Sequence, residues 1–251
     1  MAAPNGAHRT KSDHPNLPIT ISEIVREAKA CFEAGAAALH LHIRSATGGH
    51  TIDPGIYREA LAELGSTVPD MPVQITTEAA GIYSTQEQLR VLQELNPSWA
   101  SVAIREIARK PEIAAQVYAS CANVGTKVQH IIYDQTDLDL LIHWTNVGIL
   151  KYEAVEVIFV IGQYNPSIVG TLSALDSICR NRPDWISSWM VCAFGPKEHL
   201  ILLAAAAQGA DLRVGFENNI SRPNGQRANS TAEAVARLRS DLRRTQPDKT
   251  S

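Results

Sequence analysis

Short apolar runs of the kind that form β-strands alternate with longer segments of helical periodicity along the chain. Seven such runs occur, over residues 38–44, 73–78, 99–106, 127–134, 155–162, 187–194 and 212–218. A first helix is expected from Ser22, whose hydroxyl can cap a helix N-terminus, to Gly35. Later helices are expected to begin near Pro54, Thr85, Pro111, Thr136, Gly170, Lys197 and Ser230. Such alternation implies parallel strands joined by helical crossovers.

The even spacing of these elements predicts a (β/α)8 TIM barrel, a closed ring of parallel strands inside a ring of helices. The missing eighth strand should come before residues 4–15, where only Met1, Ala2 and Ala3 stand, so the first strand is expected to be shortened. A seven-unit or open α/β sheet is the alternative. No glycine-rich dinucleotide loop follows any strand, which favours the barrel, and the 251 residues are expected to form one barrel domain.

Composition and charge narrow the possible partners. A formal net charge of −3 without a clustered basic face argues against nucleic acid. No run approaches the roughly 18 apolar residues that a membrane span needs, and no signal-peptide pattern is present. We therefore expect a cytoplasmic protein with no membrane partner. The four scattered cysteines fit free thiols, with Cys31 and Cys192 buried.

Residues 38–44 place two histidines one residue apart in an apolar strand. Side chains alternate along a strand, so Leu39 and Leu41 share one face. His40 and His42 share the other face, which in a barrel points inward near the C-terminal mouth. Glu217 faces inward at the end of the last strand, which closes beside the first ones. Two imidazoles and a carboxylate suit a catalytic Zn²⁺ or another divalent metal, so these three residues are the predicted ligands.

Other strands send polar side chains to the same inward face. These side chains are Gln74, Thr76, Glu78, Ser101, Arg105 and Arg213. Burying such charges without a partner or a ligand is too costly for an ordinary core. The barrel mouth is therefore predicted to be a functional site.

Several motifs resemble the β-keto acid cleavage enzymes, the family around 3-keto-5-aminohexanoate cleavage enzyme. They are the N-terminal "PNGAHRTKSDHPNLPIT", the "HLH" strand, "DPGIYREAL", "CAFG" and "LRVGFENNISRPNGQRANSTAEAV". The resemblance implies a (β/α)8 barrel with one divalent metal, usually zinc, held at His40, His42 and Glu217, and a catalytic arginine at Arg213. It also implies a retro-Claisen exchange in which a β-keto acid and acetyl-CoA give acetoacetate and a new acyl-CoA. Members are homo-oligomers, so a dimer or tetramer is expected.

Three positions depart from the family pattern. The family has an acidic residue after the glutamate ligand, where this chain has Asn218, which cannot act as a base. "TTEAAG" replaces a Ser/Thr-Gly-Gly run and introduces Glu78, and "GAH" replaces "GAE" and introduces His8. The hypothesis is that Glu78 replaces the missing base, with His8 as a second candidate. The alternative is that Glu78 forms an ion pair with Arg105.

Further residues at predicted strand ends are expected to line a substrate pocket. These are Asn5, Thr10, Thr76 and Arg105, with Tyr133 and Tyr164 beside them. Two competing functions remain. An amidohydrolase-like enzyme also uses "HxH" on a barrel strand, but it needs further histidines and an aspartate at later strand ends. Here the last strand ends in Glu217 and Asn218, and no later strand ends in histidine. A degenerate barrel that binds a metal and a metabolite without turnover is the other.

Overall fold

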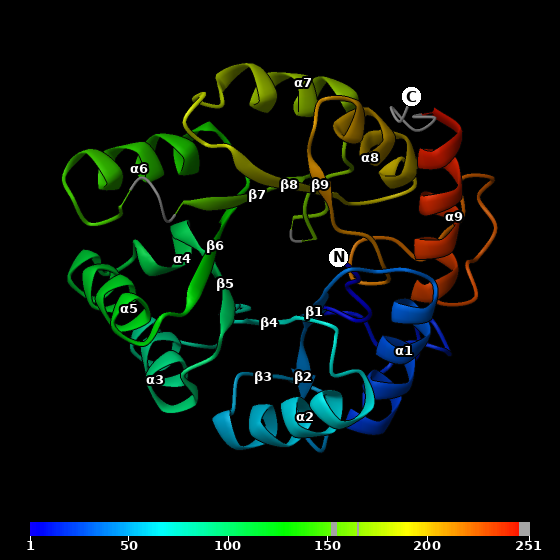
Figure 1. The fold of residues 1–251 in the computed structure, drawn as a ribbon, viewed down its shortest axis with the longest axis horizontal. Helices are drawn as coiled ribbons and strands as arrows, with labels where there is room; N and C mark the ends of the chain where they lie inside the picture. Colours follow the sequence, from blue (N-terminus) through cyan, green and yellow to red (C-terminus); the bar gives the residue numbers. More distant parts are fainter. Residues whose placement is uncertain (152–154, 165, 246–251) are drawn as a thin grey trace.

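The strands form a ring of parallel neighbours with the helices packed around its outside (Figure 1). This computed structural model describes residues 1–151, 155–164 and 166–245. The sheet runs, in order, through β1 (Leu39–Leu41), β4 (Val73–Thr76), β5 (Trp99–Ala103), β6 (Lys127–Ile132), β7 (Glu156–Ile161), β8 (Ser188–Ala193) and β9 (Asp211–Leu212). The surrounding helices are α1 (Ile21–Glu33), α2 (Pro54–Thr67), α3 (Thr85–Leu95), α5 (Pro111–Val124), α6 (Gln135–Asn146), α7 (Leu172–Asn181), α8 (Glu198–Ala207) and α9 (Thr231–Thr245). Each of the seven helices predicted after the first begins within two residues of its predicted start.

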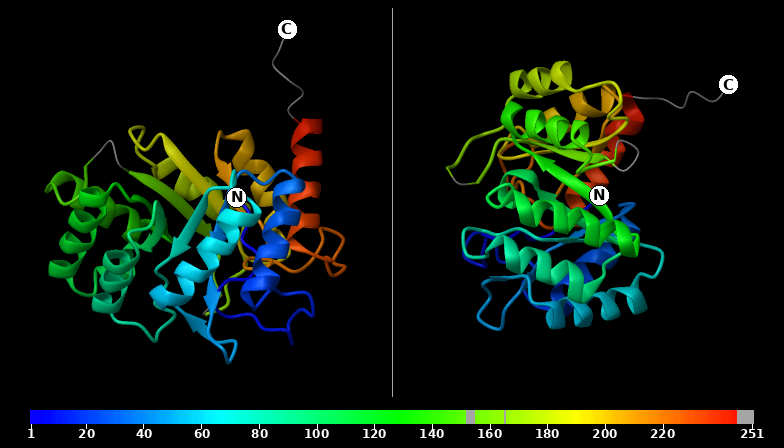
Figure 2. Two further views of the ribbon diagram at one scale, coloured as in Figure 1. Left: turned by 60° about the horizontal axis from the view of Figure 1, so that its bottom comes forward. Right: turned by 90° about the vertical axis from the view of Figure 1, so that its left-hand side faces the viewer.

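The N-terminal residues close the ring between β1 and the chain just beyond β9. Ala2 bridges Leu39 on one side and Val214 on the other, in parallel on both. The amide of Ala2 donates to the carbonyl of Ala38 (2.8 Å), and the amide of Ala3 donates to that of Val214 (3.0 Å). The predicted (β/α)8 barrel with a shortened first strand is therefore confirmed, and the open-sheet alternative is wrong. Helix α9 then packs against α1 and α8, so the last helix lies beside the first (Figures 1 and 2).

Three predicted strands change direction or conformation before their expected ends. Residues 38–44 split, because β2 (Ile43–Arg44) leaves the barrel sheet and pairs antiparallel with β3 (His50–Thr51). Residues 99–106 change after Ala103 into the short helix α4 (Ile104–Ile107). Residues 212–218 leave the sheet at Gly215, whose φ of +149° turns the chain across the N-terminal segment. The strands that carry predicted site residues therefore stop pairing with their neighbours before or close to those residues.

The N-cap of helix α1 lies two residues before the residue that the sequence predicted. Thr20, not Ser22, is the N-cap, and its hydroxyl accepts from the amide of Glu23 while the Glu23 carboxylate accepts from the amide of Thr20. This reciprocal pair satisfies two amides that a helix start leaves without partners. The deciding signal is the glutamate three residues after the threonine. Gly35 lies just after the C-cap Ala34, with φ +92°, as expected for a helix end.

The apolar side chains divide between two cores. On β7, Val157 and Phe159 join the large core between strands and helices, whereas Ile158 and Val160 join a smaller cluster inside the ring. Apolar side chains therefore fill the inside of the ring along β7, and the polar site residues lie at its C-terminal mouth. Cys31 and Cys192 are buried free thiols, as predicted. Among the described residues, no helix combines the length and apolar character that crossing a membrane requires.

Candidate metal centre

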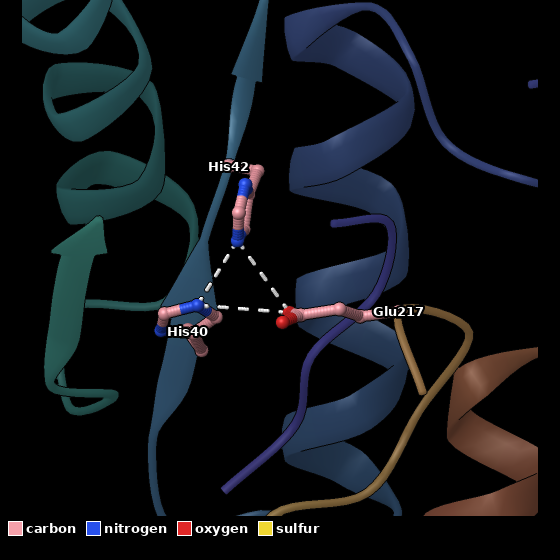
Figure 3. A group of neighbouring side chains, drawn as sticks. All are labelled: His40, His42 and Glu217. Atoms are coloured by element: carbon pink, nitrogen blue, oxygen red, sulfur yellow. Dashed lines mark hydrogen bonds and ion pairs between the residues drawn. The ribbon is translucent and has the colours of Figure 1, made fainter. Parts of the chain in front are cut away.

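His40, His42 and Glu217 converge at the mouth of the barrel and point toward one another (Figure 3). The two imidazole Nε2 atoms lie 3.1 Å apart, and each lies 3.6 Å from Oε2 of Glu217. Ligands about 2.0–2.1 Å from a tetrahedral zinc lie roughly 3.3 Å from one another. The three atoms therefore fit one triangular face of such a site, with the fourth position open.

Glu217 provides the clearest sign that a cation belongs here. Its Oε1 pairs with Arg213 (3.0 Å), but its buried Oε2 has no hydrogen-bond partner in the described part of the chain. Burial raises the pKa of Glu217, and the charge of Arg213 opposes that effect. A buried carboxylate oxygen without a partner is costly. A metal ion bound between Oε2 and the imidazoles would remove that cost, so the residues fit the metal.

The local backbone explains why these side chains meet. His40 is on β1, where its amide donates to the carbonyl of Ala2 (2.8 Å), and His42 lies in the break before β2. The amide of Glu217 donates to the carbonyl of Ala3 (3.1 Å) after the turn at Gly215. The N-terminal segment therefore holds the first and last parts of the site together.

A chain of amides orients His40. Its Nδ1 lies 2.7 Å from Oε1 of Gln74 on β4, and Gln74 Nε2 donates to Oε1 of Gln129 on β6 (3.2 Å). An acceptor at Nδ1 places the ring proton there and leaves the Nε2 lone pair for a metal. Burial, and then the charge of Arg213, lowers the pKa of His40 well below its usual range. His42 is likewise buried and its pKa is also lowered, so both rings are neutral ligands.

A cavity of about 280 Å³ opens over the triad. The predicted site residues that line it are Asn5, His8, Thr76, Glu78, Arg105 and Arg213, together with Tyr133 and Tyr164. Thr10 lies outside it, because its exposed hydroxyl bonds to Asp13 in a turn. Asn218 is fully buried and is not in the lining; both polar atoms of its side chain have no partner among the described residues.

Glu78 and His8 form a polar pair beside the metal ligands. His8 Nε2 lies 3.2 Å from Oε1 of Glu78, and Oε2 of Glu78 lies 3.8 Å from His42 Nε2. The hydrogen bond with Glu78 raises the pKa of His8. Burial would raise the pKa of Glu78, but the hydrogen bond from His8 and the electrostatic effects of His42, His50 and His8 together outweigh it, and the pKa falls to about 2. Glu78 is thus positioned as an anion that orients His8.

The alternative ion pair between Glu78 and Arg105 is not formed in the described structure. Arg105 lies on α4 and pairs instead with Asp134 (2.6 Å) and Asp137 (2.7 Å). Its place on a helix, rather than on a continuing strand, turns its guanidinium towards α6. Arg105 lines the cavity as predicted, but it does so from a helix, because the strand ends two residues earlier.

Sequence reasoning missed two charged residues of the cavity, Arg9 and Glu106. Arg9 follows His8 directly, and this adjacency was the available signal. Glu106 accepts from the amide of Ala79 (3.0 Å) and from Gln88 (2.7 Å), and burial raises its pKa to about 7. Arg9 lies in a loop without strand periodicity. Glu106 was the last residue of the predicted strand 99–106, but that strand ends at Ala103 and Glu106 lies on α4.

Comparisons with known proteins agree with this geometry. A model of the beta-keto acid cleavage enzyme family matches residues 1–248. A 3-keto-5-aminohexanoate cleavage enzyme from Fusobacterium nucleatum is 28% identical over 246 residues, which cover 94% of this chain and 88% of the relative. A 3,5-dioxohexanoate:acetyl-CoA acetone transferase from Paraburkholderia graminis is 26% identical over 274 residues, with 94% and 87% covered.

A likeness to solved structures supports the fold. ObcA, in a binary complex with oxaloacetate, matches with a TM-score of 0.71 at 17% identity. The match covers 91% of this chain and 64% of ObcA, so the chain spans less than two thirds of that protein. The family match over nearly the whole sequence is the decisive finding, and this chain belongs to the β-keto acid cleavage enzyme family.

Proposed function

We propose that the protein is a zinc-dependent β-keto acid cleavage enzyme that uses acetyl-CoA. The single observation that supports this most is the buried triad with its orphaned Glu217 oxygen, placed beside Arg213 at the mouth of a family barrel. In the proposed reaction a β-keto acid and acetyl-CoA give acetoacetate and a new acyl-CoA. The name of the Paraburkholderia relative, which includes acetyl-CoA, supports the co-substrate.

In this mechanism His40, His42 and Glu217 would hold the zinc. When bound, the metal supplies Lewis acidity for the keto oxygen and the enolate charge. Arg213 is buried, and its Nε and Nη1 have no partner among the described residues. Its fixed positive charge can therefore stabilise developing negative charge without reorganisation. Thr76 and Arg105, on the cavity wall, contact the substrate.

Proton transfer is assigned to the His8–Glu78 pair. Asn218 has no acid–base chemistry, whereas His8 lines the cavity and is held 3.2 Å from Glu78. We propose that His8 moves the α-proton of the keto acid and that Glu78 orients its ring. This modifies the hypothesis from the sequence, in which Glu78 itself was the first candidate for the base.

The metal assignment is tested by metal analysis of the purified protein and of two variants. His40→Ala should lose stoichiometric zinc, because it removes one of the three ligands. His143→Ala, which changes an exposed histidine on α6, should retain it. Wild-type zinc content and affinity in His40→Ala would contradict the site.

Activity is tested by acetoacetate formation from β-keto acids and acetyl-CoA. Stoichiometric zinc without turnover of any keto acid would favour the second candidate, a barrel that binds a metabolite without converting it, which the presence of Asn218 motivates. His8→Gln and Glu78→Gln should bind zinc normally and lose about 10²–10⁴-fold in turnover. They should also slow deuterium uptake at the α-carbon without acetyl-CoA. Full turnover in Glu78→Gln would contradict the pair.

We further propose a cytoplasmic homo-oligomer, a dimer or a tetramer. Ile168 and Val169, just before α7, and Leu200 on α8 are large apolar side chains at least half exposed. Their exposure is consistent with burial against a second copy. Light scattering of the purified protein gives the mass, and a monomer at micromolar concentration would contradict this proposal.

A further inference from the structure

Of the three arginines that line the cavity, Arg9 is the one without an anionic partner among the described residues. We propose that Arg9 binds a second carboxylate, at the far end of the substrate, so that the preferred β-keto acid is a dicarboxylic one. This inference rests on the proposed function, because it assumes that the first carboxylate lies at the metal triad. The inference goes further than the proposed function by naming the kind of substrate side chain that the cavity accepts, one that ends in a carboxylate.

The other arginines around the cavity are already engaged. Arg105 pairs with Asp134 and Asp137, and Arg213 pairs with Glu217. Arg44, behind the wall, donates to the carbonyls of Gly6, Gly48 and Arg9. Arg9 makes one long hydrogen bond, from Nη2 to the carbonyl of Asn218 (3.4 Å).

The buried part of Arg9 is a second sign of a missing partner. Its Nε is buried and has no hydrogen-bond partner among the described residues. A buried charged donor without an acceptor is unfavourable, and a carboxylate is the acceptor that fits the planar guanidinium fork. The carboxylates on the same wall are taken, since Glu78 bonds to His8 and Glu217 bonds to Arg213. An anion from the substrate would satisfy Arg9.

Neighbouring rings hold Arg9 in place. Its guanidinium carbon lies 5.0 Å from the centre of the Tyr164 ring, and Tyr164 meets the edge of Phe194 at 5.7 Å. Its own carbonyl accepts from Arg44 (2.9 Å), which pins the loop. Stacking on Tyr164 leaves the edge of the fork available for hydrogen bonds. The donor is therefore organised before a ligand arrives.

The position of Arg9 suits the far end of a short substrate. A series of contacts leads from the triad through Glu78 and His8 to Tyr164, on which Arg9 lies. Along it the exposed fraction of the side chain rises from 1% at His42 to 25% at Glu78 and 40% at His8. A phosphate of coenzyme A is the other possible anion. The cavity of about 280 Å³ favours the carboxylate of a small acid.

The test compares ligands that differ only at the far end. Calorimetry on the zinc-loaded protein measures binding of adipate and hexanoate, which are non-reacting and of equal length. Wild type should bind adipate about tenfold or more tightly than hexanoate, in line with a charge-assisted pair. Arg9→Gln should lose this preference and bind hexanoate as before. Arg243→Gln, an exposed change on α9, should behave as wild type.

Two further measurements separate the possible failures. Coenzyme A is titrated into the same variants; if Arg9→Gln weakens its binding and not that of adipate, the anion is a phosphate and the proposal is overturned. Turnover is measured with the six-carbon 3-oxo dicarboxylic acid and with 3-oxohexanoic acid. An Arg9-dependent adipate preference without any turnover would support this site and contradict the proposed activity. An unchanged adipate preference in Arg9→Gln would overturn the proposed carboxylate site at Arg9.

Discussion

At the scale of single residues, the metal ligands depend on side chains that never touch the metal. Gln74 fixes the ring of His40 through Nδ1, and Gln129 in turn holds the amide of Gln74. Both glutamines are buried inside the ring. Such outer contacts determine which imidazole nitrogen carries the proton, and hence whether Nε2 is free to bind.

Gln74→Leu tests this contact. Removing the acceptor frees the His40 ring to adopt the other tautomer or rotate, so zinc affinity should fall by about 10–100-fold. Competition with a chromogenic chelator measures the affinity. Gln129→Leu is the matched control, since it touches Gln74 but not His40, and it should have a smaller effect. Equal losses in the two variants would show that general packing, rather than the His40 contact, is responsible.

Strand alternation predicts that His40 and His42 share a face, because they lie at and just after the end of β1. It places Glu78 at the mouth for the same reason, two residues after β4. Glu217 lies five residues beyond β9 and after the turn at Gly215, so its approach to the histidines depends on that turn and not on a continuing strand.

Arg9 could not be placed, because a loop gives no period from which to infer a face. Glu106 was missed because the strand predicted over residues 99–106 ends at Ala103, and alternation does not apply on the four-residue helix that follows. Thr10 was misplaced as pocket lining, since its turn with Asp13 directs it outward.

At the scale of single elements, the N-cap of α1 can be tested by comparing substitutions at Thr20 and at Ser22. Thr20→Ala removes the side chain that accepts from the amide of Glu23, and it should reduce the free energy of unfolding by about 1 kcal/mol. Ser22→Ala changes the second residue of the helix and should leave the free energy of unfolding unchanged or slightly higher, because alanine has the higher helix propensity. Urea unfolding of both variants measures the difference. A larger loss in Ser22→Ala would place the cap at Ser22.

Helix α8 begins with a buried carboxyl, Glu198, which is 3% exposed. Burial raises its pKa from 4.5 to about 8. The unfolded chain therefore releases this proton near pH 4.5 while the folded protein keeps it, so Glu198 reduces stability as the pH rises from 4.5 to 8.

Glu198→Gln removes this pH dependence and keeps an oxygen that can accept from Gly215. The variant should gain stability over wild type at pH 8 relative to pH 5, by at least about 1 kcal/mol. Urea unfolding at the two pH values measures it. Glu59→Gln, on the exposed face of α2, should show no such gain. An equal difference at both pH values in Glu198→Gln would contradict the raised pKa.

At the scale of the whole molecule, Gly215 is where the ring closes. A Cβ atom there would lie 2.3 Å from the carbonyl oxygen of Ala3 and 2.8 Å from Cγ2 of Thr231, and the backbone has φ +149°. Three distant parts of the chain therefore meet without room for a side chain. The turn also sets the position of Glu217 two residues later.

Gly215→Ala should reduce both stability and zinc affinity. Gly209→Ala is the matched control, because Gly209 has φ +87° and open space around it, so only backbone strain of about 1–2 kcal/mol is added. The Gly215 variant should lose clearly more stability than the control in urea, and chelator competition should show weaker zinc binding. Equal losses with normal zinc affinity would mean that the closure tolerates the added atom.

The barrel itself could be predicted because each strand–helix unit has its own periodicity and its own start and stop signals. Its closure was predicted only as a shortened first strand before residue 4, because one bridge at Ala2 involves too few residues to leave a pattern of its own. The hairpin β2–β3 was missed for a related reason, because two-residue strands do not show alternation. Long helices and strands can be predicted from their own sequence, whereas strands of two residues form only because of the segments they pair with in the fold.

Closure through Ala2 has a consequence for the order of events when the protein is made. The partners of the first three residues include Val214 and Glu217, so this segment stays half-paired until more than four fifths of the chain has been synthesised. Chains fold as they emerge, starting from the N-terminus. The two histidines are present early, but their carboxylate partner arrives almost last. A nascent chain, or one truncated before Glu217, therefore carries two of the three ligands and cannot bind zinc in a wrong fold with all three.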